Sequence, residues 1–199
     1  MTYTFMESKN NFTNSIIEEF SEFISDEESN KLIELAEIDL KKMTVLGESS
    51  PNDYRIAEGT WLSNDQEPMK MIRYRISQLL DINPENMEAT HIVKYNVGGE
   101  YKVHHDFFHT NTDYSESALK RGGQRVYTAL IYLNDNFTGG ETEFPKLNIT
   151  VKPEKNKLVI WKNLKDNDEL NMDSLHAGLP VKLGCKYILI IWIRKNKFI

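Results

Sequence analysis

Apolar residues recur with two different periods, that of a helix in the first part of the chain and that of a strand in the second. Ser25 and Glu28 form a capping box, which predicts a helix that begins there and carries an apolar stripe as far as Leu40. A second helix is predicted over residues 65–80. Residues 54–62, between the two helices, have the pattern of a strand.

From residue 88 onward, short strand-like segments alternate with turns that often contain paired glycines. The predicted strands cover residues 88–96, 125–133, 141–144, 149–151, 158–161, 174–177 and 186–193, and a shorter one runs through Tyr101. The last strand is nearly all apolar, so we expect both of its faces to be buried. Residues 108–124 are polar and have no period, which predicts a long loop.

This succession of elements predicts the fold class. Many short strands with a turn about every ten residues are typical of a sandwich or jelly roll. Because the helices precede the strands, the chain should be α+β and mainly β, with an N-terminal helical layer. A length of 199 residues fits one domain, in which residues 1–87 form a helical support layer with early strands and residues 88–199 form the jelly-roll core.

Composition narrows the classes of function. With 30 acidic and 24 basic residues the formal net charge is −6, so bulk charge does not draw the chain to nucleic acid. The single cysteine, Cys185, cannot form an intrachain disulfide, which fits a reducing compartment. Residues 1–13 lack the apolar run of a signal peptide, and no stretch reaches the ~18 apolar residues of a membrane span. We expect a cytoplasmic protein without a membrane partner, in a host cell if its source is a virus.

A histidine and an aspartate separated by one residue are the first candidate metal ligands. In a strand, His104 and Asp106 project from the same face, whereas His105 projects from the other. One more imidazole from a distant strand would complete the two histidines and one carboxylate of non-haem Fe(II) oxygenases. His176 is the natural third ligand, and His109 and His105 are its rivals. Alone, the His-x-Asp tripeptide is weak evidence, because it also occurs at polar strand edges.

A lysine begins the apolar strand 186–193. The simpler interpretation of Lys186 is a solvated strand end. The functional interpretation is a salt bridge to a carboxylate in the mouth of the barrel. An iron site that needs a two-electron co-substrate would require such an anchor.

Four segments together resemble the prolyl 4-hydroxylases of the Fe(II)- and 2-oxoglutarate-dependent dioxygenase superfamily. Residues 95–106 resemble the family's Tyr-x5-Tyr-x2-His-x-Asp strand pair. Residues 125–145 resemble its arginine strand and Gly-Gly-Glu-Thr-x-Phe-Pro hairpin, and residues 174–186 resemble its second-histidine segment. Residues 55–61 resemble its Arg-x-x-x-Gly-Thr-Trp strand, so that the resemblance spans about residues 16–194.

The resemblance implies a double-stranded β-helix with the N-terminal helices packed on its major sheet, and it implies a role for nine residues. The implied Fe(II) ligands are His104, Asp106 and His176. The implied partners of the distal carboxylate of 2-oxoglutarate are Lys186, Tyr95 and Thr142. The implied substrate-facing residues are Tyr101, Arg125 and Trp192.

The activity implied by the resemblance is that of a dioxygenase similar to procollagen-proline 4-dioxygenase. It would hydroxylate peptidyl proline at C4, consume O2 and form succinate and CO2, with ascorbate as a further cofactor. The sequence departs from the family at His105, where an aromatic residue is frequent, and at Ala57, where a serine is frequent. We find no separate peptide-binding domain and no secretory signal, which puts collagen in doubt as the substrate, though not proline.

Two alternatives stay open. The nearer is a related 2-oxoglutarate dioxygenase that acts on lysine, a free amino acid or a nucleobase. The acidic balance disfavours nucleic acid, despite a small basic tail formed by Arg194, Lys195 and Lys197. The more distant alternative is a non-enzymatic jelly-roll binding module, in which the candidate ligands would coincide by chance. A decarboxylation assay separates them, because only an enzyme of the superfamily forms succinate.

Overall fold

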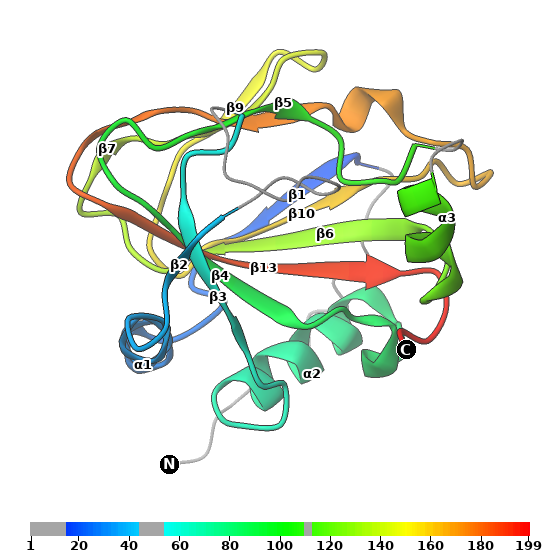
Figure 1. Cartoon of the computed structure of the whole chain (residues 1–199), viewed down its shortest axis with the longest axis horizontal. Helices are drawn as coiled ribbons and strands as arrows, with labels where there is room; N and C mark the ends of the chain where they lie inside the picture. The colour runs from blue at the N-terminus through cyan, green and yellow to red at the C-terminus, as the bar shows by residue number, and fades with distance from the viewer. Residues whose placement is uncertain (1–14, 44–53, 110–112) are drawn as a thin grey trace.

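Two antiparallel sheets form the centre of the molecule, and two helices cover the outer face of the larger sheet (Figure 1). The computed structural model describes residues 15–43, 54–109 and 113–199. The larger sheet has seven strands in the order β1 (Ile17–Phe20), β10 (Leu158–Lys162), β6 (Arg125–Tyr132), β13 (Lys186–Arg194), β4 (Thr90–Tyr95), β3 (Glu58–Leu62) and β2 (Lys41–Lys42). The smaller sheet has four, in the order β5 (Tyr101–His104), β11 (His176–Gly178), β8 (Thr142–Phe144) and β9 (Ile149–Val151). A separate pair joins β12 (Val181–Leu183) and β7 (Thr138–Gly139).

Helices α1 (Asp26–Ala36) and α2 (Met69–Leu80) pack on the larger sheet, as the resemblance implied. A third helix, α3 (Asp113–Lys120), lies at one end of the molecule (Figure 1). Single 3-10 turns occur at Pro84–Asn86 and Met172–Ser174. Within the described ranges, no helix has the length and apolar character needed to cross a membrane.

The central strand β13 shows how the core is divided. All nine of its residues are buried, which confirms the prediction for this apolar segment. Its odd-numbered residues from 187 to 193 pack with α1 and α2, and its even-numbered apolar residues from 188 to 192 face the smaller sheet. Alternation along the strand therefore also turns Lys186 toward the space between the sheets. The predicted α+β, mainly β jelly roll is confirmed.

The predicted boundaries of the N-terminal elements need correction. The capping box at Ser25 is present, because its side chain accepts from the backbone N–H of Glu28 and the Glu28 carboxylate accepts from that of Ser25. However, α1 ends at Ala36, and Leu40 packs against the same core from the following segment. The sequence pattern did not indicate β1, whose four residues lack alternation and are held by pairing with β10.

The segment 108–124, predicted to be a long loop, contains helix α3. Its buried positions are Ser115 and Ala118, which are one helical turn apart. Such small side chains do not produce a visible apolar stripe, so the period was missed. The segment is closed by Gln124, whose side chain accepts from Phe108 N at 2.7 Å and donates to Phe108 O at 2.8 Å.

Candidate active site

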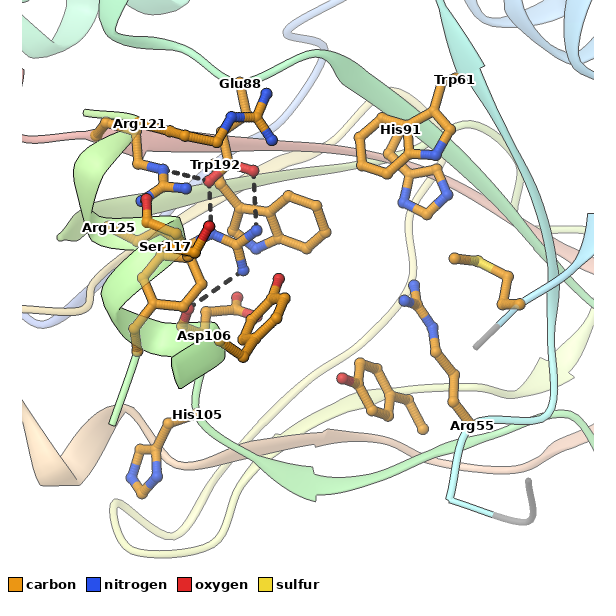
Figure 2. Close-up of a pocket in the computed structure, with 16 residues that line it drawn as sticks. Arg55, Trp61, Glu88, His91, His105, Asp106, Ser117, Arg121, Arg125 and Trp192 are labelled. Atoms are coloured by element: carbon orange, nitrogen blue, oxygen red, sulfur yellow. Dashed lines mark hydrogen bonds and ion pairs between the residues drawn. The ribbon is translucent and has the colours of Figure 1, made fainter. Parts of the chain in front are cut away.

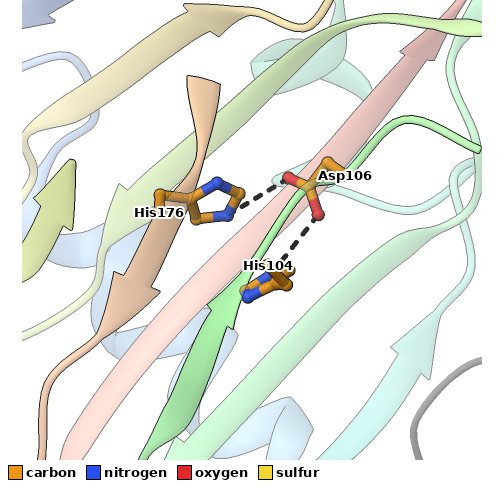
Figure 3. Close-up of side chains that lie close together, drawn as sticks. All are labelled: His104, Asp106 and His176. Atoms are coloured by element: carbon orange, nitrogen blue, oxygen red, sulfur yellow. Dashed lines mark ion pairs between the residues drawn. The ribbon is translucent and has the colours of Figure 1, made fainter. Parts of the chain in front are cut away.

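Three side chains suited to metal binding converge at two neighbouring strands of the smaller sheet (Figure 3). His104 ends β5, Asp106 follows two residues later, and His176 begins β11, where it pairs in register with His104. Their potential ligand atoms lie within 4.8 Å of one another. The Nε2 atoms of His104 and His176 lie 3.7 and 3.6 Å from the two carboxylate oxygens of Asp106. The structure thus brings together the three residues that were predicted as ligands.

Backbone hydrogen bonds orient both imidazoles. His104 Nδ1 lies 2.7 Å from the carbonyl oxygen of Lys102, and His176 Nδ1 lies 2.9 Å from that of Ser174. A ring nitrogen that is hydrogen-bonded to a carbonyl oxygen must carry a proton. In both rings, Nε2 is therefore the atom that can bind a metal, on the side that faces Asp106. Burial and the nearby His176 lower the pKa of His104 to about 3, which keeps this ring neutral, as metal binding requires.

A chain of hydrogen bonds holds the carboxylate of Asp106. Thr128 Oγ1 donates to Asp106 Oδ2 at 2.7 Å, and Asn163 Nδ2 donates to Thr128 Oγ1 at 2.8 Å. Burial alone would raise the pKa of Asp106. The two imidazoles, Arg125 and the bond from Thr128 outweigh burial and lower that pKa, so the carboxylate is ionised.

The rival histidines lie outside this group. His105 places its Nε2 3.2 Å from the carbonyl oxygen of Met172, and its ring stacks on Phe107 with centroids 4.4 Å apart. His109 packs edge-on against His105, with ring centroids 5.6 Å apart. Neither belongs to a group of potential ligand atoms in the described part of the chain.

Lys186 is not a solvated strand end. Its side chain is 2% exposed, and Nζ donates to the carbonyl oxygen of Gly140 at 2.6 Å. The ammonium lies 5.2 Å from the ring centroid of Tyr95 and 5.4 Å from that of Tyr132. No carboxylate in the described ranges forms an ion pair with it. A buried ammonium without an anionic partner is costly, so this pocket is suited to an incoming carboxylate.

Two hydroxyl groups lie between the sheets near this lysine. Thr142 Oγ1 is 2.7 Å from Tyr132 Oη, and both side chains are buried. Thr142 was predicted to contact a co-substrate carboxylate, whereas Tyr132 was missed. Tyr132 lies four residues after Thr128 on β6 and therefore on the same face, but neither residue was a predicted site residue, so nothing in the sequence indicated that this face meets Thr142.

A cavity of about 390 Å³ opens beside the metal-ligand group and includes Asp106 in its wall (Figure 2). All three predicted substrate-facing residues, Tyr101, Arg125 and Trp192, line it. Tyr101 stacks on His104 with ring centroids 3.6 Å apart, and burial raises the pKa of its hydroxyl, which keeps it protonated.

Arg125 is buried, unlike a charged residue at the exposed end of a surface strand. Its Nε and one terminal nitrogen donate to the Glu88 carboxylate at 2.7 and 2.9 Å. The other terminal nitrogen donates to Asp106 O at 3.3 Å. Its guanidinium also lies 3.9 Å from the ring centroid of Trp192. Arg125 thus links the cavity wall to the metal-ligand segment.

Three other residues of the cavity wall had no predicted functional role. Arg55 comes from the segment before β3, Glu88 from the segment before β4, and His91 from β4 itself. His91 stacks on Trp61 with ring centroids 4.1 Å apart. The alternation of β4 and the Arg-x-x-x-Gly-Thr-Trp segment contained the signal, but the facing elements could be assigned only in three dimensions.

Comparison with known proteins fits this geometry. Residues 90–194, which contain all three candidate ligands and Lys186, match the family described as the 2OG-Fe(II) oxygenase superfamily. The chain belongs to the 2OG-Fe(II) oxygenase superfamily. It is 32% identical over 203 residues to a probable prolyl 4-hydroxylase 8 of Arabidopsis thaliana, covering 90% of this chain and 68% of that protein.

Other relatives of this 2OG-Fe(II) oxygenase carry similar names. The chain is 38% identical over 181 residues to the prolyl 4-hydroxylase subunit alpha-3 of Mus musculus, covering 88% of this chain. It spans only 33% of that mouse subunit. A solved structure of the viral collagen prolyl hydroxylase from Paramecium Bursaria Chlorella virus-1, in a 2OG complex, aligns with a TM-score of 0.72 at 29% identity. That alignment covers 90% of this chain and 96% of the viral one.

The residues present fit the two groups after which the superfamily is named. Two imidazoles and one carboxylate, oriented by backbone and threonine hydrogen bonds, are the donor set of a non-haem Fe(II) site. The unpaired Lys186 ammonium matches a carboxylate of 2-oxoglutarate. Gly178, two residues after His176, shows that the candidate metal site and the lysine pocket adjoin, because a Cβ at this position would lie 3.9 Å from Lys186 Nζ.

The Thr128 bond to Asp106 gives a testable expectation. We expect Thr128→Val to lower the affinity for a divalent metal by about 10- to 100-fold, because Asp106 loses the donor that orients it. Anaerobic calorimetric titration with Fe(II) measures this affinity. The control is Thr150→Val, an exposed position on β9. An unchanged affinity in Thr128→Val would show that the carboxylate is oriented by other groups.

Proposed function

We propose that this chain is a prolyl 4-hydroxylase that hydroxylates proline within a peptide, at C4, consuming O2 and 2-oxoglutarate and forming succinate and CO2. The observation that carries this proposal is twofold: the candidate metal ligands lie beside the cavity, and Lys186 is buried between the sheets near Gly178, two residues after His176. Among the described residues, Lys186 has no ion-pair partner. Proteins named as prolyl 4-hydroxylases align with most of this chain, which supports proline as the substrate.

In this proposal His104, Asp106 and His176 hold Fe(II), which when bound activates O2 for the oxidation. Lys186 binds the distal carboxylate of 2-oxoglutarate, with Tyr95 beside it and the Thr142 hydroxyl held by Tyr132. Packing between the sheets excludes water from the ammonium, which strengthens its attraction for the carboxylate. Ascorbate as a further cofactor stays a prediction.

The cavity of about 390 Å³ is the proposed binding site of the peptide substrate. Tyr101 and Trp192 offer aromatic faces for a proline ring, and Arg125 offers a cation close to the metal ligands. A proline-rich segment is already extended in solution, so it enters such a cavity at little ordering cost. We therefore assign peptidyl proline, and not free proline, as the substrate.

We further propose that residues 1–199 act as one catalytic domain, with residues 1–87 as a support layer and residues 88–199 as the jelly-roll core. Support comes from β1, β2 and β3, which precede residue 88 and complete both edges of the larger sheet. We place the enzyme in the cytoplasm, because its one cysteine, Cys185, suits a reducing compartment.

The test combines succinate measurement with mass spectrometry. The full chain is incubated with Fe(II), 2-oxoglutarate, O2 and a proline-rich peptide, and we expect succinate together with a peptide heavier by about 16 Da on proline. Free proline, a lysine peptide and a methylated nucleobase are run in parallel. Oxygen on one of these instead would show a different dioxygenase. Absence of succinate with every substrate would favour a binding module.

The pH dependence of co-substrate binding offers another prediction. Burial lowers the pKa of Lys186 to about 7, although Glu141 opposes this shift; Tyr95 and Tyr132 are the other titratable groups that face its ammonium. In the free protein, stability should therefore fall as pH decreases from about 10.5 toward 7, because the lysine of the unfolded chain takes up a proton in this range while the buried amine stays neutral.

A bound carboxylate favours the charged lysine, so binding above pH 7 should take up a proton. We expect the affinity for a non-reactive 2-oxoglutarate analogue to weaken by up to about tenfold per pH unit above 7. Calorimetry in buffers with different ionisation enthalpies counts the protons, with a redox-inert divalent metal present. Lys182→Met, an exposed position on β12, should keep this uptake, whereas Lys186→Met should lose it. Binding without proton uptake in the unmodified protein would contradict the assignment.

A further inference from the structure

The cavity beside the metal-ligand group is cationic, although the chain carries a net charge of −6. Its wall contains the four arginines Arg55, Arg121, Arg125 and Arg194. Within the part of the chain that the structure describes, it contains two carboxylates, those of Glu88 and Asp106. Asp106 faces the two histidines, so among the described wall residues the Glu88 carboxylate is the one acid left to balance the arginines.

Two of the arginines share Glu88. The Glu88 carboxylate binds Arg125 through both oxygens at 2.7 and 2.9 Å, and Arg194 Nε lies 2.6 Å from Oε1. All three side chains are buried, with exposed fractions of 6% or less. Two cations on one anion leave this cluster with a single positive charge. Arg121, at the outer end, donates to the backbone oxygen of Ile199 at 2.9 Å and adds a further cation.

Among the described residues, Arg55 is the arginine of the cavity wall whose guanidinium has no hydrogen-bond acceptor. Its side chain is 6% exposed, and two guanidinium nitrogens, Nε and one terminal nitrogen, are buried without a hydrogen-bond acceptor. No carboxylate in the described ranges forms an ion pair with it. The guanidinium packs 4.6 Å from the ring centroid of Tyr101 and points into the cavity (Figure 2). Burial of unpaired donors on a cation is costly, so an anion that enters here satisfies them.

A second unpartnered donor lines the same space. Trp192 is 6% exposed, and its indole Nε1 is buried without an acceptor. Figure 2 shows Arg55 and Trp192 on different sides of the cavity. The cavity therefore offers donors and positive charge to a ligand rich in acceptor oxygens. A neutral, collagen-like segment provides only carbonyl oxygens, whereas a peptide carboxylate provides both charge and two acceptors.

We propose that this cavity selects acidic peptides, and that Arg55 binds a carboxylate located close to the target proline. This inference rests on the proposed function for its substrate, and it adds a specificity determinant. The carboxylate comes from an aspartate or glutamate side chain or from the end of the peptide, and the assay separates these sources. Lys186 serves a different carboxylate, that of the co-substrate, because it lies between the sheets and is not part of the cavity wall.

The test uses short peptides with one central proline. The first peptide is blocked at both ends and has glutamate on each side of the proline. The second is the same peptide with glutamine in place of both glutamates. The third also has glutamine in place of glutamate, but it has a free terminal carboxylate next to the proline. For each, kcat/KM is measured by succinate formation and Kd by fluorescence anisotropy of a labelled peptide. We expect the glutamate peptide to exceed the glutamine peptide by about tenfold or more in both quantities. A gain with the third peptide alone would assign the terminal carboxylate.

Variants locate the contact. Arg55→Gln should reduce the glutamate-to-glutamine ratio to about twofold or less, and Arg55→Lys should keep part of it, since the charge is retained. The control Lys152→Gln removes a positive charge from an exposed position after β9 and should leave the ratio unchanged. Circular dichroism checks folding, and the peptide comparison in the unmodified protein decides the matter even if Arg55→Gln does not fold.

The outcomes separate this inference from the proposed function. Equal kcat/KM and equal Kd for the glutamate and glutamine peptides, with proline hydroxylated in both, would overturn the acidic preference and leave the hydroxylase standing. Tighter binding of the glutamate peptide without hydroxylation of any proline would support the anion site and overturn the hydroxylase. A glutamate preference that persists undiminished in folded Arg55→Gln would overturn the role of Arg55.

Discussion

Replacing His176 by alanine is expected to abolish turnover and to weaken metal binding by at least about a hundredfold. His176 begins β11, and its Nε2 lies 3.6 Å from the Asp106 carboxylate, with His104 in register on the neighbouring strand. Without it, one imidazole and one carboxylate remain, which is too few protein ligands for the proposed facial site. Succinate formation and calorimetric titration with Fe(II) measure the two effects.

The matched control is His109→Ala. This exposed histidine packs against His105 and Phe107, with ring centroids 5.6 and 4.9 Å away, and lies outside the ligand group. We expect it to retain both metal affinity and turnover to within about twofold. Equal losses in the two variants would mean that the third ligand had been assigned wrongly. Loss of turnover in His176→Ala with full metal affinity would point to a different role for this ring.

The sequence carried most of the information for the ligand group, because its chemistry is local. A strand places residues two apart on one face, so the pair His104 and Asp106 could be read directly. The resemblance then singled out His176 and Lys186. The register of β11 against β5 decides between His176 and its rivals. It pairs His176 with His104, which is 72 positions earlier in the sequence (176 − 104 = 72).

The groups that support the site were harder to predict. Thr128 and Tyr132 act through hydrogen bonds to Asp106 and Thr142, and an isolated strand does not show which polar side chain its neighbour will meet. The contacts of Glu88 with Arg125 and Arg194 join the segment before β4 to both β6 and β13. Such long-range pairs depend on strand order, whereas helix and strand periods depend only on neighbouring residues.

Helix α3 was missed for a related reason. Its buried side chains are small, and a distant residue contacts it, because a terminal nitrogen of Arg194 donates to the carbonyl oxygen of Ala118 at 3.2 Å. A helix held by such distant contacts has a weak pattern of its own. The error matters for function, because α3 contributes a wall of the cavity, including Ser117 and Ala118. The cavity therefore has a more ordered wall than a loop would provide.

The second large effect is expected at Lys186. Lys186→Met should raise the 2-oxoglutarate requirement by at least about thirtyfold, since removing a charge-assisted contact from a desolvated pocket costs on the order of 2–5 kcal/mol. The exposed Lys182→Met on β12 is the matched control and should leave the requirement unchanged. Succinate formation over a range of 2-oxoglutarate concentrations measures it. An unchanged requirement in Lys186→Met would contradict the assignment.

Thermal unfolding distinguishes a binding role for Lys186 from a structural one. Among the described residues, this buried ammonium is balanced by one carbonyl oxygen, two tyrosine rings and the Coulomb attraction of Glu141, and burial still lowers its pKa to about 7. A methionine of similar length removes an unpaired charge from an apolar environment, so Lys186→Met should unfold at the same or a higher temperature without co-substrate. With saturating 2-oxoglutarate analogue and metal, the unmodified protein should gain stability, because a ligand that binds only the native state shifts the equilibrium toward it. Lys186→Met should gain much less. If the variant instead unfolded at a lower temperature yet kept the full gain on binding, Lys186 would support the fold and another group would hold the distal carboxylate.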